Sequence, residues 1–523
     1  MSRQVTSILL LVGLITGANL LLAASVRGAS AESLQLERDV ELDTLLTQRA
    51  RYALERVALV DGQSRPRHVN ASLNIATGVI TVRLDRSFLP EDYGPSFEDQ
   101  RSNINNGLIY EAEKFAPVSA VEYLYDGKDI YHYFPEVKAA DDAARLEGER
   151  RRQAAERSGL AVVAAGHGYF MSYRTNTWVT SRDEHNGVSE GLLTPLYAGE
   201  LRALVEARSG MAVTRARVQE PGTTHPESGF EWWTMAARYA IAQQYPMETG
   251  IWNTYAGSTL WDREEREDIN SRPKLANHVG ADVVIHLHSN GEDSGVVRGS
   301  RVIVQPGRAV DAVLGRSVLC SMKELIQSRA GYETFVVAPA PHVDNKGENR
   351  EAHMPSIIVE TAFHTNPADA AALLDPEFRA ASMKGVEKGY RLFREGKDCK
   401  PLKGEAIEDV SMSQGASREI EVPFEGYPQY PLRIVTRNVG CPPGWACRGS
   451  EITVEAPQPT PLKIALSCNN GGSAPLFWET SLVIVTGSNR CRSGIGSSAS
   501  VVHRPGLHGM AAPPLAQYSG SRV

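Results

Sequence analysis

The sequence predicts an α/β fold: a three-layer domain on a mostly parallel twisted sheet, flanked by an N-terminal α+β module and a C-terminal all-β domain. The central domain is predicted by three short apolar runs, each followed by polar side chains. They are Leu160–Ala165 before Gly166-His167-Gly168, Val283–Leu287 before His288-Ser289-Asn290, and Ile357–Val359 before Glu360. Such runs are typical of buried parallel strands, and open α/β sheets bind their ligands at the carboxyl ends of these strands.

Helical patterns alternate with these strands. Leu201 and Leu204 lie on one face of a predicted helix that ends at Gly210, before a strand over Met211–Thr214. This is a βαβ unit with a glycine C-cap, the building block of a parallel sheet. Asp375-Pro376 caps a later amphipathic helix that closes the domain near Cys399.

A chain of 523 residues exceeds the roughly 250–300 residues that a single core supports, so several domains are expected. An apolar stretch over residues 8–24, followed by Ala29-Ser30-Ala31, is typical of a secretory signal peptide. We expect a signal peptide at 1–31, an α+β module at 32–136, a charged linker or solvated helix at 137–158, the central domain at 159–399, a disulfide-containing β domain at 400–493 and a disordered tail at 494–523.

The net charge of −7 is small for this length, and the sequence shows no excess of basic residues of the kind that binds nucleic acid. No later stretch reaches the roughly 18 apolar residues that span a bilayer, so the mature chain is expected to have no membrane span. Six cysteines suit an exported protein with disulfides. A bridge from Cys320 to Cys399 would join the last helix of the central domain to its neighbour, whereas the last four cysteines allow three pairings.

The flanking regions have their own periodicities. A helical pattern over 46–60, a hairpin around Thr77-Gly78 and a helix around Leu108 build the N-terminal module, which resembles the small GerMN-type domains of cell-envelope proteins. Beyond Pro401 the apolar period changes to two, which predicts a small β-sandwich or barrel. The N-terminal module contains no catalytic constellation and is expected to be a targeting or interaction module. The C-terminal domain has no recognised motif, although appended domains of this kind often bind a ligand.

Two imidazoles and a carboxylate at the ends of neighbouring strands predict a zinc site. The Gly-His-Gly turn, a downstream Glu, a strand-end His-x-Asn and a final Val-Glu-x-x-Phe-x-x-Asn occur here in the order found in the zinc-dependent N-acetylmuramoyl-L-alanine amidases. The resemblance covers about 159–394. It implies that His167 and His288 bind zinc and that Glu360 is the catalytic carboxylate.

The resemblance also implies a third ligand, a Glu early in the helix after the first strand. Glu190 stands at nearly the family's distance, with Glu184 and His185 as the alternatives. Arg272, Asn290 and His364 are the candidate substrate contacts, and His364 is expected in an exposed loop. His286 is placed on the strand face opposite to His288 and is expected to pack.

The sequence departs from the family at the first strand. Ala164 stands where the family usually has an Asp that orients the first histidine, which removes a hydrogen bond of the second coordination shell. A longer insertion follows from about Arg217 to Asp262 and is rich in Trp and Tyr, which either fill a core or contact sugar rings.

The function implied is hydrolysis of the amide bond between the lactyl group of N-acetylmuramic acid and L-alanine, by zinc-activated water with Glu360 as acid and base. Peptidoglycan is the expected partner, no nucleic acid is expected, and the flanking domains are candidate sites for envelope proteins. The expected location is periplasmic or secreted. Two alternatives stay open: a zinc peptidase acting within the stem peptide, and a catalytically silent wall-binding protein.

Overall fold

The computed structural model describes residues 31–154, 157–218, 220–405, 407, 415–440, 443, 449–458, 461–467, 477–484 and 501–503. The chain divides into two compact units. The first comprises Met1–Asp142 with two short segments from later in the sequence, Glu292–Val297 and His342–Asp344. The second comprises Ala143–Gly291, Arg298–Pro341 and Asn345–Val523. The boundary therefore falls at 142/143, inside the segment expected to be a linker, which is helical (α5, Pro135–Ala154).

The first unit is an α+β arrangement of a small sheet and its helices. Its sheet has the order β1-β2-β3-β10, in which β1 and β2 form the predicted antiparallel hairpin and β3 runs parallel to β2. Alternate residues of β2, including Ile80 and Val82, are fully buried against the helices. The elements are α2 (Ala31–Arg56), β1 (Val69–Asn74), β2 (Val79–Leu84), η1 (Arg86–Phe88), α3 (Pro95–Ala112), β3 (Ala120–Tyr125), α4 (Ile130–Tyr133) and β10 (His342–Val343).

The helix predicted over 46–60 differs from helix α2 at both ends, since α2 begins at Ala31 and ends at Arg56. Its first residues are strongly charged and have no clear apolar stripe, which explains why periodicity alone located only the later turns. Among the described residues, no helix is both long enough and apolar enough to cross a bilayer.

The second unit contains the predicted mostly parallel sheet, with the strand order β9-β11-β8-β4-β7. β4, β7, β8 and β11 run parallel, and β9 pairs antiparallel with β11. Every residue of β8 is buried, as expected of a central strand covered on both faces. The strands are β4 (Leu160–Ala165), β7 (Ala212–Arg215), β8 (Val283–Asn290), β9 (Arg301–Val304) and β11 (Ser356–Phe363), and a hairpin is formed by β5 (Tyr169–Ser172) and β6 (Thr177–Thr180).

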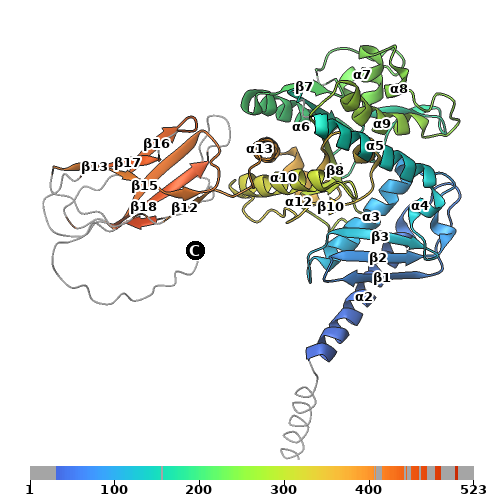
Figure 1. Cartoon of the computed structure of the whole chain (residues 1–523), viewed down its shortest axis with the longest axis horizontal. Coiled ribbons are helices and arrows are strands. Elements are labelled where there is room, and N and C mark those ends of the chain that lie inside the picture. Colours follow the sequence, from blue (N-terminus) through green and yellow to red (C-terminus); the bar gives the residue numbers. More distant parts are fainter. Residues whose placement is uncertain are drawn as a thin grey trace, which may run out of the picture. The chain divides into compact units, whose positions relative to one another are not determined.

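Two groups of helices accompany this sheet (Figure 1). α9 packs with α7, α8 and α11, and its Leu275 and Ala276 join core clusters with Ala164 and Val162 of β4. α10 and α13 pack against each other, and α13 also packs on α6. The helices are α6 (Glu190–Leu204), η2 (Val205–Ser209), η3 (Trp232–Thr234), α7 (Ala237–Gln244), α8 (Thr249–Trp252), α9 (Arg263–His278), α10 (Ala309–Gln327), α11 (Gly347–Arg350), α12 (Pro367–Leu374) and α13 (Pro376–Arg394).

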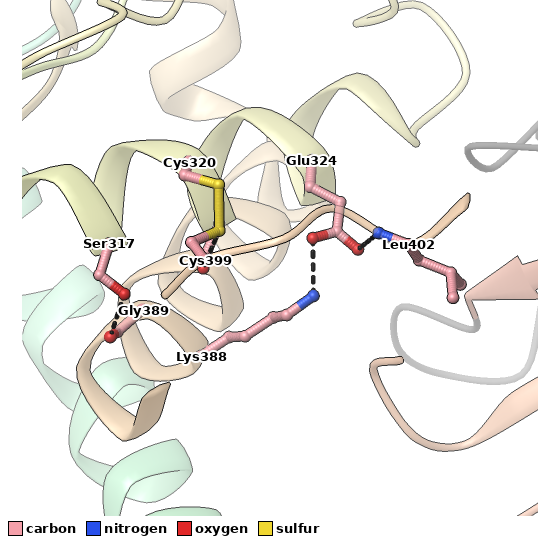
Figure 2. The surroundings of a disulfide bond; sticks show 8 residues. Ser317, Cys320, Glu324, Lys388, Gly389, Cys399 and Leu402 are labelled. Atoms are coloured by element: carbon pink, nitrogen blue, oxygen red, sulfur yellow. Dashed lines mark hydrogen bonds and ion pairs between the residues drawn. A yellow bond between two sulfur atoms is a disulfide. The ribbon is translucent and has the colours of Figure 1, made fainter. Parts of the chain in front are cut away.

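The predicted disulfide between Cys320 and Cys399 is present, with Cα atoms 6.2 Å apart. Figure 2 shows that it ties α10 to the segment after α13. Beside it, Lys388 Nζ of α13 lies 2.6 Å from Glu324 Oε2 of α10, and Glu324 Oε1 accepts a hydrogen bond from the backbone N–H of Leu402 at 3.3 Å. The end of the α/β domain is thus fixed by a covalent bond and by a buried ion pair.

In the described part of the C-terminal segment, the assigned elements are strands. Leu402, Ile420, Leu432 and Ile464 belong to one buried cluster. The strands are β12 (Lys403–Gly404), β13 (Ser417–Glu421), β14 (Phe424–Glu425), β15 (Leu432–Gly440), β16 (Ser450–Val454), β17 (Lys463–Ser467), β18 (Phe477–Ile484) and β19 (Val501–His503).

One correction concerns the tail expected to be disordered over 494–523. Residues 501–503 form strand β19, which pairs antiparallel with β18. The other residues of that tail, residues 1–30 of the expected signal peptide, and Cys441, Cys447, Cys468 and Cys491 lie outside the described residues.

Candidate metal centre and active site

The first candidate ligand, His167, lies in a tight turn directly after strand β4. Its φ of 59° is in the left-handed region, which few residues other than glycine adopt, and Gly168 follows with a φ of 128°. A Cβ added to Gly166 would lie 2.3 Å from Cε1 of His288. Gly166 therefore allows the turn to approach the second histidine, and Gly168 allows it to approach the backbone of Met235 and Ala236.

The structure brings His167, Glu190 and His288 together. Each offers one ligand atom, and these atoms all lie within 4.8 Å of one another. Glu190 Oε1 lies 3.1 Å from His288 Nδ1 and 3.6 Å from His167 Nε2. Glu190 is the first residue of α6, and its Oε1 also accepts a hydrogen bond from the backbone N–H of Ser289 at 2.9 Å. All three side chains are buried.

The alternatives for the third ligand are placed differently. Glu184 and His185 are both exposed, in the loop before α6. Neither belongs to the group of residues that could share a metal ion. The geometry therefore favours Glu190, as the spacing in the sequence does.

The electrostatics of His167 and Glu190 suit metal binding. Burial lowers the pKa of His167 to about 3, although Glu190 opposes the shift. Burial opposes ionisation of Glu190, but His167 and His288 outweigh it and hold the pKa of Glu190 below its usual range. A neutral imidazole and an ionised carboxylate are the forms in which these groups bind a metal. Two histidines and one carboxylate are a donor set found in catalytic zinc sites, so the residues present fit zinc.

Glu348 is a functional candidate that the sequence did not reveal. Its Oε2 lies 3.0 Å from Nε2 of His288, on the side of the imidazole ring opposite to Glu190. Burial opposes protonation of His288, but the carboxylates of Glu348 and Glu190 outweigh burial and raise the pKa of His288 to about 10. A carboxylate on the second ring nitrogen is the usual device that orients a metal-binding histidine.

Two expectations about the surroundings of Glu348 need correction. His286 does not face away from His288, because residues two apart on a strand share a face, and His286 Nδ1 also lies 3.0 Å from Glu348 Oε2. Arg272 is fully buried and is ion-paired with both Asp268 and Glu348. These partners favour a role for Arg272 in holding Glu348, rather than the substrate contact predicted for it.

Glu360 lies on the strand next to that of the candidate ligand His288. In the parallel pairing of β11 with β8 it lies directly opposite His288. Burial, with a contribution from Glu190, raises the pKa of Glu360 to about 7, although His288 and Lys346 act in the opposite direction. Among the described residues, Glu360 Oε2 has no hydrogen-bond partner. The pKa of Glu360 is thus close to 7, and its Oε2 can accept a hydrogen bond from a substrate or a water molecule.

The other two predicted substrate residues lie close to the ligands in the sequence but are largely enclosed. His364 is 3% exposed, so the expectation of an exposed loop is wrong, and its Nδ1 lies 3.0 Å from Ser289 Oγ. Asn290 is 8% exposed, and its Oδ1 accepts a hydrogen bond from the backbone N–H of Gly291. Their contacts place them as supports of the strand end after His288.

The turn that carries His167 is held by Arg217, which the sequence did not single out. The buried guanidinium donates to the carbonyl oxygens of Gly166 at 3.0 Å, Trp233 at 2.9 Å and Met235 at 2.9 Å. Burial lowers the pKa of Arg217 to about 9. In contrast, His167 Nδ1 is buried without a hydrogen-bond partner in the part of the chain that the structure describes, consistent with Ala164 at the family's Asp position.

Comparison with known proteins agrees with this geometry. Residues 162–390, which contain all three candidate ligands and Glu360, match the family described as N-acetylmuramoyl-L-alanine amidase. No curated protein matches the chain.

Several solved structures cover the same part of the chain. They include Ami1 from Mycobacterium smegmatis, 14% identical with a TM-score of 0.32 over 46% of this chain and 99% of that chain. AmiC2 of Nostoc punctiforme is 16% identical, with a TM-score of 0.31, and the match covers 46% of this chain and 99% of that chain. The amidase from Clostridium difficile 630 is 17% identical, with a TM-score of 0.30, and the match covers 46% of this chain and 97% of that chain. All three are N-acetylmuramoyl-L-alanine or N-acetylmuramyl-L-alanine amidases. Residues 162–390 of this chain are therefore similar to the N-acetylmuramoyl-L-alanine amidase family.

Proposed function

We propose that this protein is a zinc-dependent peptidoglycan amidase, which hydrolyses the bond between the lactyl carbonyl of N-acetylmuramic acid and the nitrogen of L-alanine. The observation that carries the proposal is the convergence of His167, Glu190 and His288 next to Glu360 within the residues that match the amidase family. Amide hydrolysis needs an activated water, stabilisation of the developing oxyanion and a proton for the leaving amine.

In this proposal His167, Glu190 and His288 hold the metal. A zinc ion bound there lowers the pKa of a water molecule towards neutrality and polarises the carbonyl group. Glu348 fixes the ring of His288 through Nε2 and so leaves Nδ1 directed at Glu190 and the metal position. The chain thereby presents its ligand atoms before the metal arrives.

Glu360 accepts and then donates a proton in the proposed reaction. Its ionised carboxylate accepts a proton from the attacking water, whose oxygen forms the new bond to the lactyl carbon. The protonated Glu360 then donates to the alanine nitrogen as the C–N bond breaks. The products are a lactyl carboxylate and a stem peptide with a free amine. A pKa raised towards 7 suits a group that must both take and return a proton.

The proposal places the protein outside the cytoplasm, in the periplasm or secreted, because its substrate is the bacterial cell wall. The Cys320–Cys399 disulfide supports this location, since disulfides persist in oxidising compartments. The flanking domains are then available for envelope proteins, as the sequence suggested.

A second candidate function is wall binding without catalysis. It is favoured by one observation: within the described ranges His167 Nδ1 has no hydrogen-bond partner to orient it, and an unoriented ligand weakens a metal site.

Product analysis of digested peptidoglycan tests the proposal. Purified sacculi would be incubated with zinc-loaded wild type and with Glu360→Gln, and the soluble products identified by mass spectrometry. We expect wild type to release intact stem peptides with a free L-alanine amine, and Glu360→Gln to lose about 10²- to 10⁴-fold in rate. Cleavage within the stem would instead identify a zinc peptidase, and wall binding without products would identify the silent alternative.

A further inference from the structure

Two aromatic rings stack on the surface next to the candidate metal centre. Tyr169, two residues after His167, begins strand β5, and its ring stacks on that of Phe230 with centroids 4.4 Å apart and an angle of 23° between the planes. Phe230 is 37% exposed and Tyr169 is partly exposed, whereas the next residue, Phe170, is buried. Strand β5 therefore directs the ring of Phe170 into the core, while Tyr169 forms a partly exposed stacked pair with Phe230 of the later segment. We call Tyr169 and Phe230 the aromatic platform.

The backbone of the platform is fixed on both sides. The N–H of His225 donates to the carbonyl oxygen of Phe230 at 2.7 Å, and the N–H of Phe230 donates to Ser228 Oγ at 3.1 Å. The ring of His225 in turn contacts Trp178, Trp232 and Tyr239, with centroids 4.8–5.3 Å apart. The backbone of Phe230 is thus hydrogen-bonded to a residue of a packed aromatic cluster.

The platform is also linked to the turn of His167. The backbone N–H of Ala236 donates to the carbonyl oxygen of Tyr169 at 3.0 Å. Arg217 joins the carbonyl oxygen of Gly166, just before His167, to those of Trp233 and Met235, three and five residues after Phe230. Arg217 is buried and makes all three bonds. It therefore connects the turn of His167 to the segment that follows Phe230.

We propose that the aromatic platform binds a pyranose ring of the glycan strand that carries the cleaved stem peptide. This inference rests on the proposed function. It assigns the sugar part of the peptidoglycan substrate to the surface next to His167. A flat uncharged pair of rings suits the apolar C–H face of a sugar, and an aromatic ring held in place loses little entropy on binding. The stem peptide, with its charged groups, finds no complementary charge on these two rings.

Binding of a plain glycan tests the proposal without any cleavage. The probe is the β-1,4-linked N-acetylglucosamine hexamer, which has the backbone of the glycan strand but no lactyl group or peptide. Calorimetric titration would compare wild type with Phe230→Leu, Phe230→Ala and Phe230→Tyr. Leucine keeps an apolar side chain against Tyr169 but has no flat face, so Phe230→Leu separates stacking from folding. Phe115→Ala, at a 64% exposed phenylalanine of the first unit, is the matched control.

We expect the hexamer to bind wild type, Phe230→Tyr and Phe115→Ala alike, and to bind Phe230→Leu and Phe230→Ala about five- to tenfold more weakly. No hexamer binding by wild type, or equal binding by Phe230→Leu, overturns the proposal.

Cleavage assays distinguish this proposal from the proposed function. Wild type and the control Phe115→Ala should cleave a soluble N-acetylmuramoyl peptide and polymeric sacculi equally well, whereas Phe230→Leu should show a raised KM for polymeric sacculi. If wild type binds the hexamer through Phe230 but cleaves neither substrate, the amidase assignment fails and the platform stands. If it cleaves both substrates with no effect of Phe230→Leu on either KM or hexamer binding, the platform fails and the amidase stands.

Discussion

Glu360 is a carboxylate whose proton affinity is set by opposing neighbours. Burial and Glu190 raise the pKa of Glu360 to about 7, from an ordinary value of 4.5, while His288 and Lys346 lower it. As a base it must be ionised, so kcat/KM should rise with pH through its pKa. A bound cation favours the ionised form, and the ascending limb is therefore expected between 4.5 and about 7. A pH profile of peptide release from sacculi would locate this limb.

The control for that profile is the wild-type zinc content at each pH, because metal loss in acid would mimic the limb. An activity that stays flat down to pH 4 with zinc retained would contradict the role given to Glu360.

Glu348 contacts the second ring nitrogen of His288 and should act on metal affinity rather than on proton transfer. Glu348→Gln keeps the shape but removes the charge that also binds Arg272 and His286. Loss of such a partner commonly costs about 10- to 100-fold in metal affinity, so we expect zinc to be released to a chelator at correspondingly lower chelator concentration. Glu351→Gln, at the end of the same short helix, should retain wild-type affinity; equal affinities in the two variants would refute the role of Glu348.

The order of motifs in the sequence singled out the three side chains that the structure brings together, but not those that support them. His167, Glu190 and His288 were found because strand ends and family spacing place them. Glu348 lies on the short helix α11 and meets His288 only through the tertiary fold, so neither periodicity nor spacing indicates it. The burial of His364 was missed for the same reason: its neighbour Ser289 is distant in sequence.

Helices α10 and α13 are joined by a buried ion pair, Lys388 with Glu324. Lys388→Met would leave the Glu324 carboxylate buried without its cation, which commonly costs about 3–5 kcal/mol in the free energy of unfolding. The double variant Lys388→Met/Glu324→Leu should recover part of that loss, because no uncompensated charge remains. Urea unfolding would measure both, with the exposed Lys397→Met as the control.

A single variant as stable as wild type would show that solvent reaches Glu324, and would contradict the burial of this pair. Equal losses in the single and double variants would show that packing, and not charge, determines the effect.

Elements with a strong period were predictable, and short elements were not. The apolar runs of β4, β8 and β11 and the caps of α13 gave the parallel sheet and its last helix. The antiparallel β9 has four residues, and the hairpin strands β5 and β6 have four residues each, too few for a clear alternation. That hairpin carries Tyr169, so the platform could be recognised only in the structure.

At the scale of the whole molecule, the compact units do not follow contiguous stretches of sequence. Residues 292–297 and 342–344 belong to the first unit, although the family match surrounds them on both sides. Within that unit Arg49 is ion-paired with Glu292, and Arg101 Nη2 lies 3.0 Å from Asp344 Oδ1. These pairs join residues more than 200 positions apart, which composition and periodicity cannot anticipate.

The measurement that tests the central claim most directly is zinc content together with stem-peptide release, on wild type, Glu190→Ala and the control Glu184→Ala. We predict about one zinc per chain and free L-alanine-ended peptides for wild type and Glu184→Ala, with both lost in Glu190→Ala. Zinc and activity retained by Glu190→Ala, or a wild type that releases stem peptides without zinc, would contradict the account.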